Sequence, residues 1–116
     1  TDKDNKEHEK IYDVTWSEMQ MRKIGKDGKV PPVGDTVDIA TATWKDTIGA
    51  SELTGVWRDP DFDPSQRAFY YARVIEIPTP TWLAYDQLRF GTKLPPEVPM
   101  KHQERAWTSP IWYTPD

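Results

Sequence analysis

Apolar and polar residues alternate with a period of two in several short stretches of the chain, which is the pattern of half-buried β-strands. Tyr12, Val14 and Trp16, for example, share one face of such a stretch. Another stretch is nearly continuous in apolar and aromatic residues, which predicts a central strand covered on both faces. The predicted strands are residues 10–17, 36–44, 50–58, 68–77 (the central one) and 104–114.

One short helix is predicted over residues 82–90, after the central strand has ended at Pro78-Thr79-Pro80. Thr81 is placed to cap its N-terminus, and Gly91 is placed to end it. Its larger apolar side chains are expected to dock against the rest of the domain: Trp82, Tyr85, Leu88 and Phe90.

Stiff connections separate these elements. The chain has eleven prolines against six glycines, which suits short strands and excludes long helices. Residues 18–35 show no sustained period and predict a long surface loop. In the third predicted strand the alternation of apolar and polar residues shifts by one position at Gly55, which predicts a bulge there. Pro110 has no backbone donor, so the last strand is expected to be at an edge or bulged there.

The fold class predicted from this order is mainly β, an antiparallel immunoglobulin-like β-sandwich with one short helix near residues 82–90. A complete sandwich of this type has about seven strands, whereas the pattern supports about five. Either the sandwich is incomplete or the long loop hides further strands. Residues 1–9 are expected to be a disordered charged leader, and residues 10–116 a single module.

Composition narrows the class of protein. The mean hydropathy of −0.80 is polar, yet 12% of the residues are aromatic, which favours a folded chain with an aromatic core. The absence of cysteine excludes disulfides, thiolate zinc sites and cysteine nucleophiles. The net charge of −4 argues against nucleic-acid binding. No apolar run approaches the ~20 residues of a membrane span.

Alternating carboxylates at Asp59, Asp61 and Asp63 resemble part of a calcium loop. The glycine that an EF-hand needs is missing, and Pro60 and Pro64 stiffen the segment. The alternative is an acidic turn in which the carboxylates accept hydrogen bonds from nearby backbone amides. Calcium is therefore a weak candidate, and no other metal site is expected in this chain.

His102 and Glu104 lie two residues apart, so on a strand they would share one face and could act as a base and its orienting carboxylate. The simpler interpretation is a solvated loop entering the last strand. No catalytic residue is predicted, because nucleophile elbows and phosphate-binding glycine loops are absent from the sequence.

The tryptophans and tyrosines support two interpretations. They could form the core of a small sandwich that has little Leu or Ile. Alternatively, exposed rings could form a platform for carbohydrate, and the candidate residues are Trp57, Tyr70, Trp107 and Trp112.

Five long stretches of the chain carry a family resemblance: Pro31–Asp38, Ile48–Leu53, Val56–Pro64, Ala68–Pro80 and Gln103–Tyr113. In this order they resemble the C-terminal segment of the bacterial domain-of-unknown-function (DUF) 3604 family. Full-length members of that family look like PHP-type metal-dependent hydrolases, whose metal ligands lie upstream of this segment. The resemblance implies a non-catalytic accessory module, with a divalent metal in the parent protein and none held by this chain.

The partner implied by that resemblance is the upstream hydrolase domain of the same chain. The segment expected to contact it is His102, Gln103, Glu104 and Arg105. A carbohydrate-binding module is the alternative function. The sequence leaves open the oligomeric state and the compartment, including a periplasmic or secreted parent.

Overall fold

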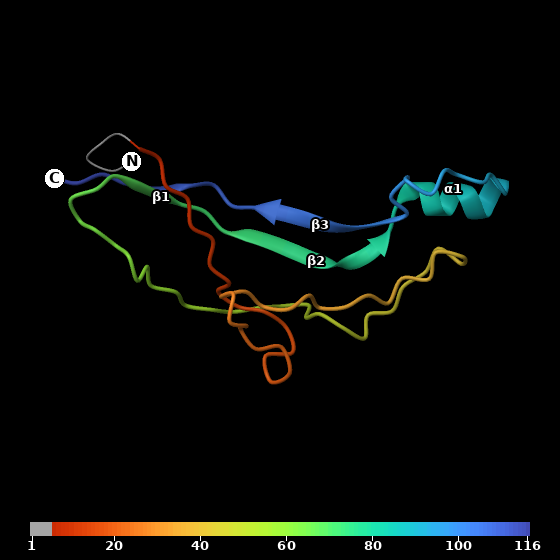
Figure 1. The fold of residues 1–116 in the computed structure, drawn as a ribbon, viewed down its shortest axis with the longest axis horizontal. Helices are drawn as coiled ribbons and strands as arrows, with labels where there is room; N and C mark the ends of the chain where they lie inside the picture. The colour runs from red at the N-terminus through yellow and green to blue at the C-terminus, as the bar shows by residue number, and fades with distance from the viewer. Residues whose placement is uncertain (1–5) are drawn as a thin grey trace.

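The computed structural model describes residues 6–116. Residues 68–113 form a long antiparallel ribbon with a helix at its tip, and irregular loops precede it (Figure 1). The elements are β1 (Ala68–Tyr70), β2 (Arg73–Pro80), α1 (Trp82–Phe90), β3 (Lys101–Trp107) and β4 (Ile111–Tyr113). β2 pairs with β3 and β1 pairs with β4, both antiparallel. Residues 1–5 of the predicted leader lie outside the described residues.

The two sheets are one hairpin interrupted at a single level. Ala72 donates its backbone N–H to Thr108 Oγ1 at 2.9 Å, and its carbonyl accepts the Thr108 N–H at 3.0 Å. These bonds keep the two chains together across the gap that separates β2–β3 from β1–β4. The predicted strands 68–77 and 104–114 are therefore present, but each is split. The second split contains Pro110, which cannot donate to a ladder.

A bulge shifts the register of β2 by one residue between Ile75 and Pro78. Gln103 donates its side-chain amide to the Glu76 carbonyl at 2.9 Å and so satisfies an acceptor at the irregularity. Because of this bulge, the alternation of inward and outward backbone groups along β2 shifts by one residue.

The predicted strands 10–17, 36–44 and 50–58 are wrong. Residues 6–66 contain no strand, only an isolated bridge between Asp38 and Thr43. Alternating residues become a strand only when a partner supplies a ladder. Here local bonds compete with pairing: the Asp38 carboxylate accepts the amide of Ala40, two residues on. Gly55 marks close packing on Val14 and Thr15 rather than a bulge.

The helix agrees with its predicted bounds. Gly91 has φ 63° and donates its N–H to the Gln87 carbonyl, so it ends α1 as expected. Thr81 occupies the N-cap position, but its hydroxyl donates to the Pro99 carbonyl at 3.0 Å instead of accepting a helix amide. The expected docking of the larger apolar side chains is wrong, because Trp82, Tyr85, Leu88 and Phe90 are all exposed.

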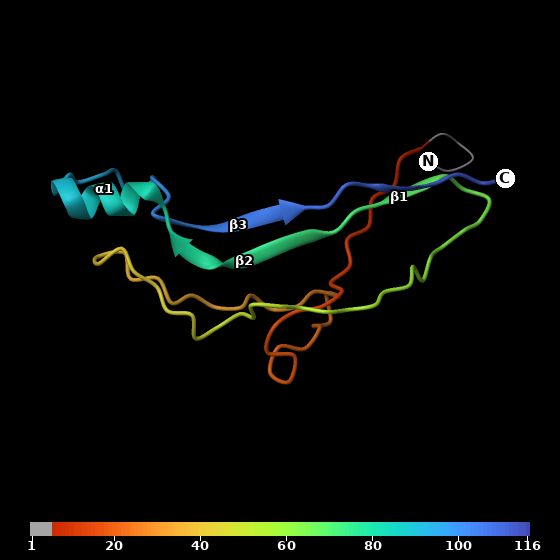
Figure 2. The ribbon, with the colours of Figure 1, turned by 180° about the vertical axis from the view of Figure 1, so that it is seen from behind.

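The architecture is mostly sheet, but it does not enclose the aromatic core that the sequence predicts. The buried residues among 6–116 are all small: Ser17, Ala42, Pro80, Thr81 and Ala84. The radius of gyration is 19.2 Å, against about 13 Å for a compact chain of this length. Figure 2 shows the reason: after the first described residues cross the β1–β4 end, the N-terminal loops run alongside β2 and leave the β2–β3 ribbon uncovered.

Candidate functional site

An aromatic cluster forms where the loop after Gly55 meets β1 and β4. The Trp57 ring lies 6.2 Å from the Tyr70 ring, edge to face, and 5.0 Å from Tyr12. Phe62 contacts Tyr113 edge to face at 5.0 Å. Edge-to-face contacts of this kind favour one arrangement of the rings beyond their burial alone. They attach an otherwise irregular loop to the ribbon.

This cluster borders an open hollow of about 660 Å³. Its walls are mostly apolar, and Arg58, Asp59 and Tyr70 are its polar residues. The lining residues are Trp57, Arg58, Asp59, Phe62, Tyr70 and Ile111.

The polar edge of the hollow is built on a contact between Tyr70 and Asp59. The Tyr70 hydroxyl donates to the Asp59 carboxylate at 2.7 Å. The hydrogen bond to Asp59, with smaller contributions from burial and charge, raises the pKa of Tyr70 to about 12. The phenol therefore stays neutral at ordinary pH. Sequence reasoning missed Arg58, Phe62 and Ile111, because Ile111 comes from a distant strand and no local signal marks the meeting.

The three carboxylates of the candidate calcium loop point to different donors. Asp59 accepts the Asp61 amide at 2.9 Å, and Asp63 accepts both the amide and the hydroxyl of Ser65. Asp61 binds Lys10 and Tyr12 instead. No group of three or more acidic or histidine side chains within residues 6–116 is arranged to hold a metal ion. The geometry matches the acidic turn, and calcium binding stays a prediction.

The contact of Asp61 with Lys10 and Tyr12 ties the start of the chain to this turn. Lys10 Nζ donates to the carboxylate at 2.7 Å and the Tyr12 hydroxyl donates at 2.5 Å. The hydrogen bond from Lys10 is the largest cause that holds the pKa of Asp61 below its usual value, followed by the one from Tyr12. These side chains are exposed, so the contact directs the loop and contributes little to stability.

His102 and Glu104 do share a face, because β3 begins at Lys101 and includes both. His102 Nε2 lies 2.5 Å from Glu104 Oε1. Nδ1 of His102 is buried and has no hydrogen-bond partner among the described residues. The segment is part of a strand rather than a solvated loop. Neither side chain forms a further hydrogen bond or ion pair within residues 6–116. Contact of this segment with another domain stays a prediction.

The four residues of the candidate carbohydrate platform do not form one row. Trp57 and Tyr70 line the hollow together. Trp112 pairs with Phe69, the neighbour of Tyr70, so it lies on the opposite face of the β1–β4 sheet. Trp107 pairs with Arg73 at the start of the other sheet. Two members of the platform are thus brought together and two are not.

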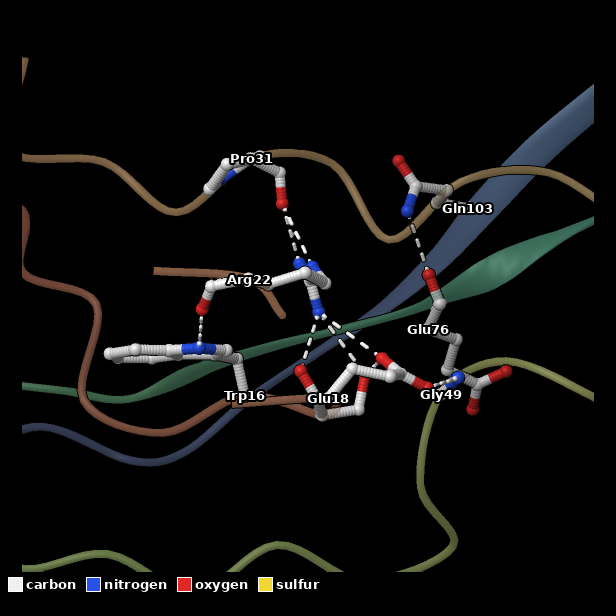
Figure 3. A network of polar contacts seen from close by, with 8 residues as sticks. Trp16, Glu18, Arg22, Pro31, Gly49, Glu76 and Gln103 are labelled. Atoms are coloured by element: carbon white, nitrogen blue, oxygen red, sulfur yellow. Dashed lines mark hydrogen bonds and ion pairs between the residues drawn. The ribbon is translucent and has the colours of Figure 1, made fainter. Parts of the chain in front are cut away.

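A polar network orders the loop before residue 31, and the sequence gives no motif for it (Figure 3). Arg22 donates through Nε and Nη2 to the Pro31 carbonyl, at 3.0 and 2.7 Å, and through Nη1 to the Ser17 carbonyl at 3.1 Å. Glu18 lies 3.7 Å from Arg22 and accepts the Gly49 amide at 2.9 Å. This network is structural, since every charged group in it has a partner within the chain.

The helix of the described residues is too short and too polar to cross a membrane. No curated protein and no solved structure matches the chain. A family model described as "Protein of unknown function (DUF3604)" matches residues 1–115. Because the match covers nearly the whole sequence, the chain belongs to the DUF3604 family.

Proposed function

We propose that this chain is a non-catalytic accessory module that packs against a second domain of its parent protein, a PHP-like metal-dependent hydrolase. The observation that carries the proposal is the exposure of its large aromatic side chains. Trp82, Trp107 and Trp112 are 69%, 59% and 72% exposed. Exposed apolar surface of this extent marks an interaction site.

The surface area supports a large interface. A folded protein of 13.5 kDa exposes about 6,500 Å², whereas this chain exposes 9943 Å². The excess of roughly 3,400 Å² on this one chain is larger than the roughly 1,000–2,500 Å² that each partner contributes to an obligate interface of about 2,000–5,000 Å² in total. Obligate partners fold around one another, and such a partner would supply the core that the ribbon lacks.

The kind of residue that is exposed also favours a protein partner. Aromatic side chains and arginine dominate the energetic centres of protein interfaces, because they bury large areas at low cost in conformational entropy. They occur on α1, β3 and β4, so the exposed surface extends along the length of the ribbon.

The hydrolase part of the proposal is supported by the resemblance alone. The divalent metal and its ligands would then belong to the other domain, and this module would help to shape the surface around them. Adding Mn²⁺ or Zn²⁺ to the purified chain should give no hydrolysis of phosphate or sulfate esters. Robust turnover would overturn the non-catalytic role.

The packing role is tested by one substitution in two contexts. Trp82→Ala should change the unfolding free energy of the 116-residue chain by no more than about 0.5 kcal/mol, because the ring is already exposed. In the parent protein the same substitution should cost about 2 kcal/mol or more, because it removes a buried anchor. Equal effects in the two contexts would contradict the proposal.

The hollow favours a second candidate function, binding of a carbohydrate. Trp57 offers an aromatic ring, and Tyr70, Arg58 and Asp59 offer polar groups beside it. Soluble polysaccharide should then quench tryptophan fluorescence, and Trp57→Ala should abolish the change, whereas Trp44→Ala, outside the hollow, should retain it. No quenching in the unmodified chain would remove this candidate.

A further inference from the structure

The β2–β3 ribbon has two outer edges. The backbone hydrogen bonds at its two ends determine which residues direct their N–H and C=O groups toward the partner strand and which direct them outward. The Thr108 amide donates to the Ala72 carbonyl, and the Thr81 amide donates to the Met100 carbonyl. Backbone groups alternate in direction along an antiparallel strand. The even-numbered residues of β3 therefore face β2. The outward N–H and C=O groups of β3 belong to Lys101, Gln103, Arg105 and Trp107.

The outer edge of β2 is poor in donors. The same alternation, shifted by the bulge, directs Pro78 and Pro80 outward, and proline has no N–H to offer. Pro80 is also buried. The loop that contains Gly49 approaches β2 closely, because a Cβ on Gly49 would lie only 2.6 Å from the Ile77 side chain. Prolines and covering loops are common means of closing a sheet edge to further strands.

The outer edge of β3 is open by comparison. It carries outward amides from end to end, and no segment of residues 6–116 pairs with it. In Figure 1 the first described residues cross the ribbon at its β1–β4 end, and the loops that follow them lie on the other side of β2–β3, next to β2. A two-stranded ribbon is marginal by itself, and a third strand is the usual addition that stabilises it.

In the three registers that would pair most of β3, its charges disfavour a second copy of the chain as that strand. In an antiparallel pair with its own copy centred on Gln103, Lys101 would lie opposite Arg105. Centred on Glu104 or on Arg105, each of these residues would face its own copy. Like charges directly opposite one another destabilise a strand pair.

We infer that the free edge of β3 receives an extended strand from the second domain of the parent protein, with a carboxylate opposite Arg105 and an apolar side chain opposite Trp107. Arg105 has no acidic partner among residues 6–116, whereas Lys101 already binds Asp35. Strand addition of this kind gains affinity from the backbone and specificity from alternate side chains. The inference depends on the packing role proposed above and specifies how the two domains join.

Amide hydrogen exchange on the parent protein tests the inference at single residues. The outward amides of Gln103, Arg105 and Trp107 should exchange at least about 100-fold more slowly than the same sequence without structure. The outward amide of Arg73, at the edge of β2, should remain close to the unstructured rate. This contrast within one molecule needs no isolated fragment.

Two proline variants of the parent protein sharpen the test. Arg105→Pro removes one outward donor of β3 and should speed exchange at Gln103 and Trp107 about tenfold or more. Arg105→Ala keeps the backbone amide and should therefore speed exchange at Gln103 and Trp107 by a smaller factor than Arg105→Pro. Arg73→Pro, at the first residue of β2, removes an outward donor from the other edge and should leave the β3 amides unchanged.

The exchange rates, read together with the acrylamide accessibility of Trp82, distinguish failure of the strand from failure of the packing role. Fast exchange at the outward amides of β3, with Trp82 still shielded from acrylamide, would overturn the strand and leave the packing role in place. Fast exchange with an accessible Trp82 would overturn both. Protection that appears only as protein concentration rises would show a second copy at this edge and refute the occupant named here.

Discussion

The Arg22 network offers the sharpest test of how the N-terminal loop is held. The guanidinium bridges two carbonyl groups, those of Pro31 and Ser17, and its side chain is only 18% exposed (Figure 3). Arg22→Lys keeps the charge but loses the planar fork that reaches both carbonyls at once. The ammonium group can replace some of these bonds and cannot replace them all.

The expected cost follows from the bonds that are lost. A hydrogen bond to a charged group contributes about 1.5–3 kcal/mol. Because the ammonium group recovers part of that, the substitution should destabilise the loop by about 1–2 kcal/mol, or roughly 5- to 30-fold in its opening equilibrium. The Gly25 amide, which donates to Lys29 within the loop, and the Trp16 indole N–H, which donates to the Arg22 carbonyl, should report that opening.

Hydrogen exchange of these two groups is the appropriate assay, because it measures local opening and does not require the whole chain to unfold in one step. Lys23→Arg, at the exposed neighbouring position, is the matched control and should change nothing. Exchange in Arg22→Lys within twofold of the unmodified chain would show that the fork does not hold the loop, and the argument from its geometry would be wrong.

Further predictions concern two glycines and one phenol. Gly91→Ala should cost about 1–2 kcal/mol in thermal or urea unfolding, because its φ of 63° disfavours any Cβ while the space around it is empty. Gly49→Ala should cost more, since its φ is 82° and its Cβ would also lie 2.6 Å from Ile77 Cγ2; equal costs would contradict the close approach. The Tyr70 phenol should titrate near pH 12 by absorbance, and Asp59→Asn should lower that value toward 10. Because the folded pKa is raised, this bond's contribution to stability is complete below pH 10 and is lost as pH rises through 12.

The parts of the fold that could be predicted are those with local signals. The helix is bounded by Thr81 and Gly91, whose conformations belong to helix ends whatever surrounds them. The two halves of the hairpin are rich in aromatic residues, which favour strands. Each half pairs with the other in the antiparallel sheets.

The remainder depended on partners that a sequence pattern does not name. Residues 36–44 alternate as a strand should, yet Asp38 and Thr43 close a tight turn in which Ala42 has φ 49°. In the candidate site, the acidic turn was predictable because an Asp carboxylate accepts an amide two residues on. The hollow was not, because it forms only where Trp57 and Ile111 meet from distant parts of the chain.

The polar mean hydropathy and the high aromatic content have one physical explanation. A core needs aliphatic volume on every side, whereas an interface needs a few large rings set in a polar surface. The ribbon fits the second description: Trp107 and Trp112 stand exposed along it, while only small residues are buried in the described part of the chain. The prolines of β2 leave one edge poor in donors, and the charges of β3 disfavour a second copy of the chain at the other edge. A polar mean hydropathy combined with a high aromatic content is unusual for an isolated domain. The combination is consistent with a module whose aromatic side chains are buried by a partner.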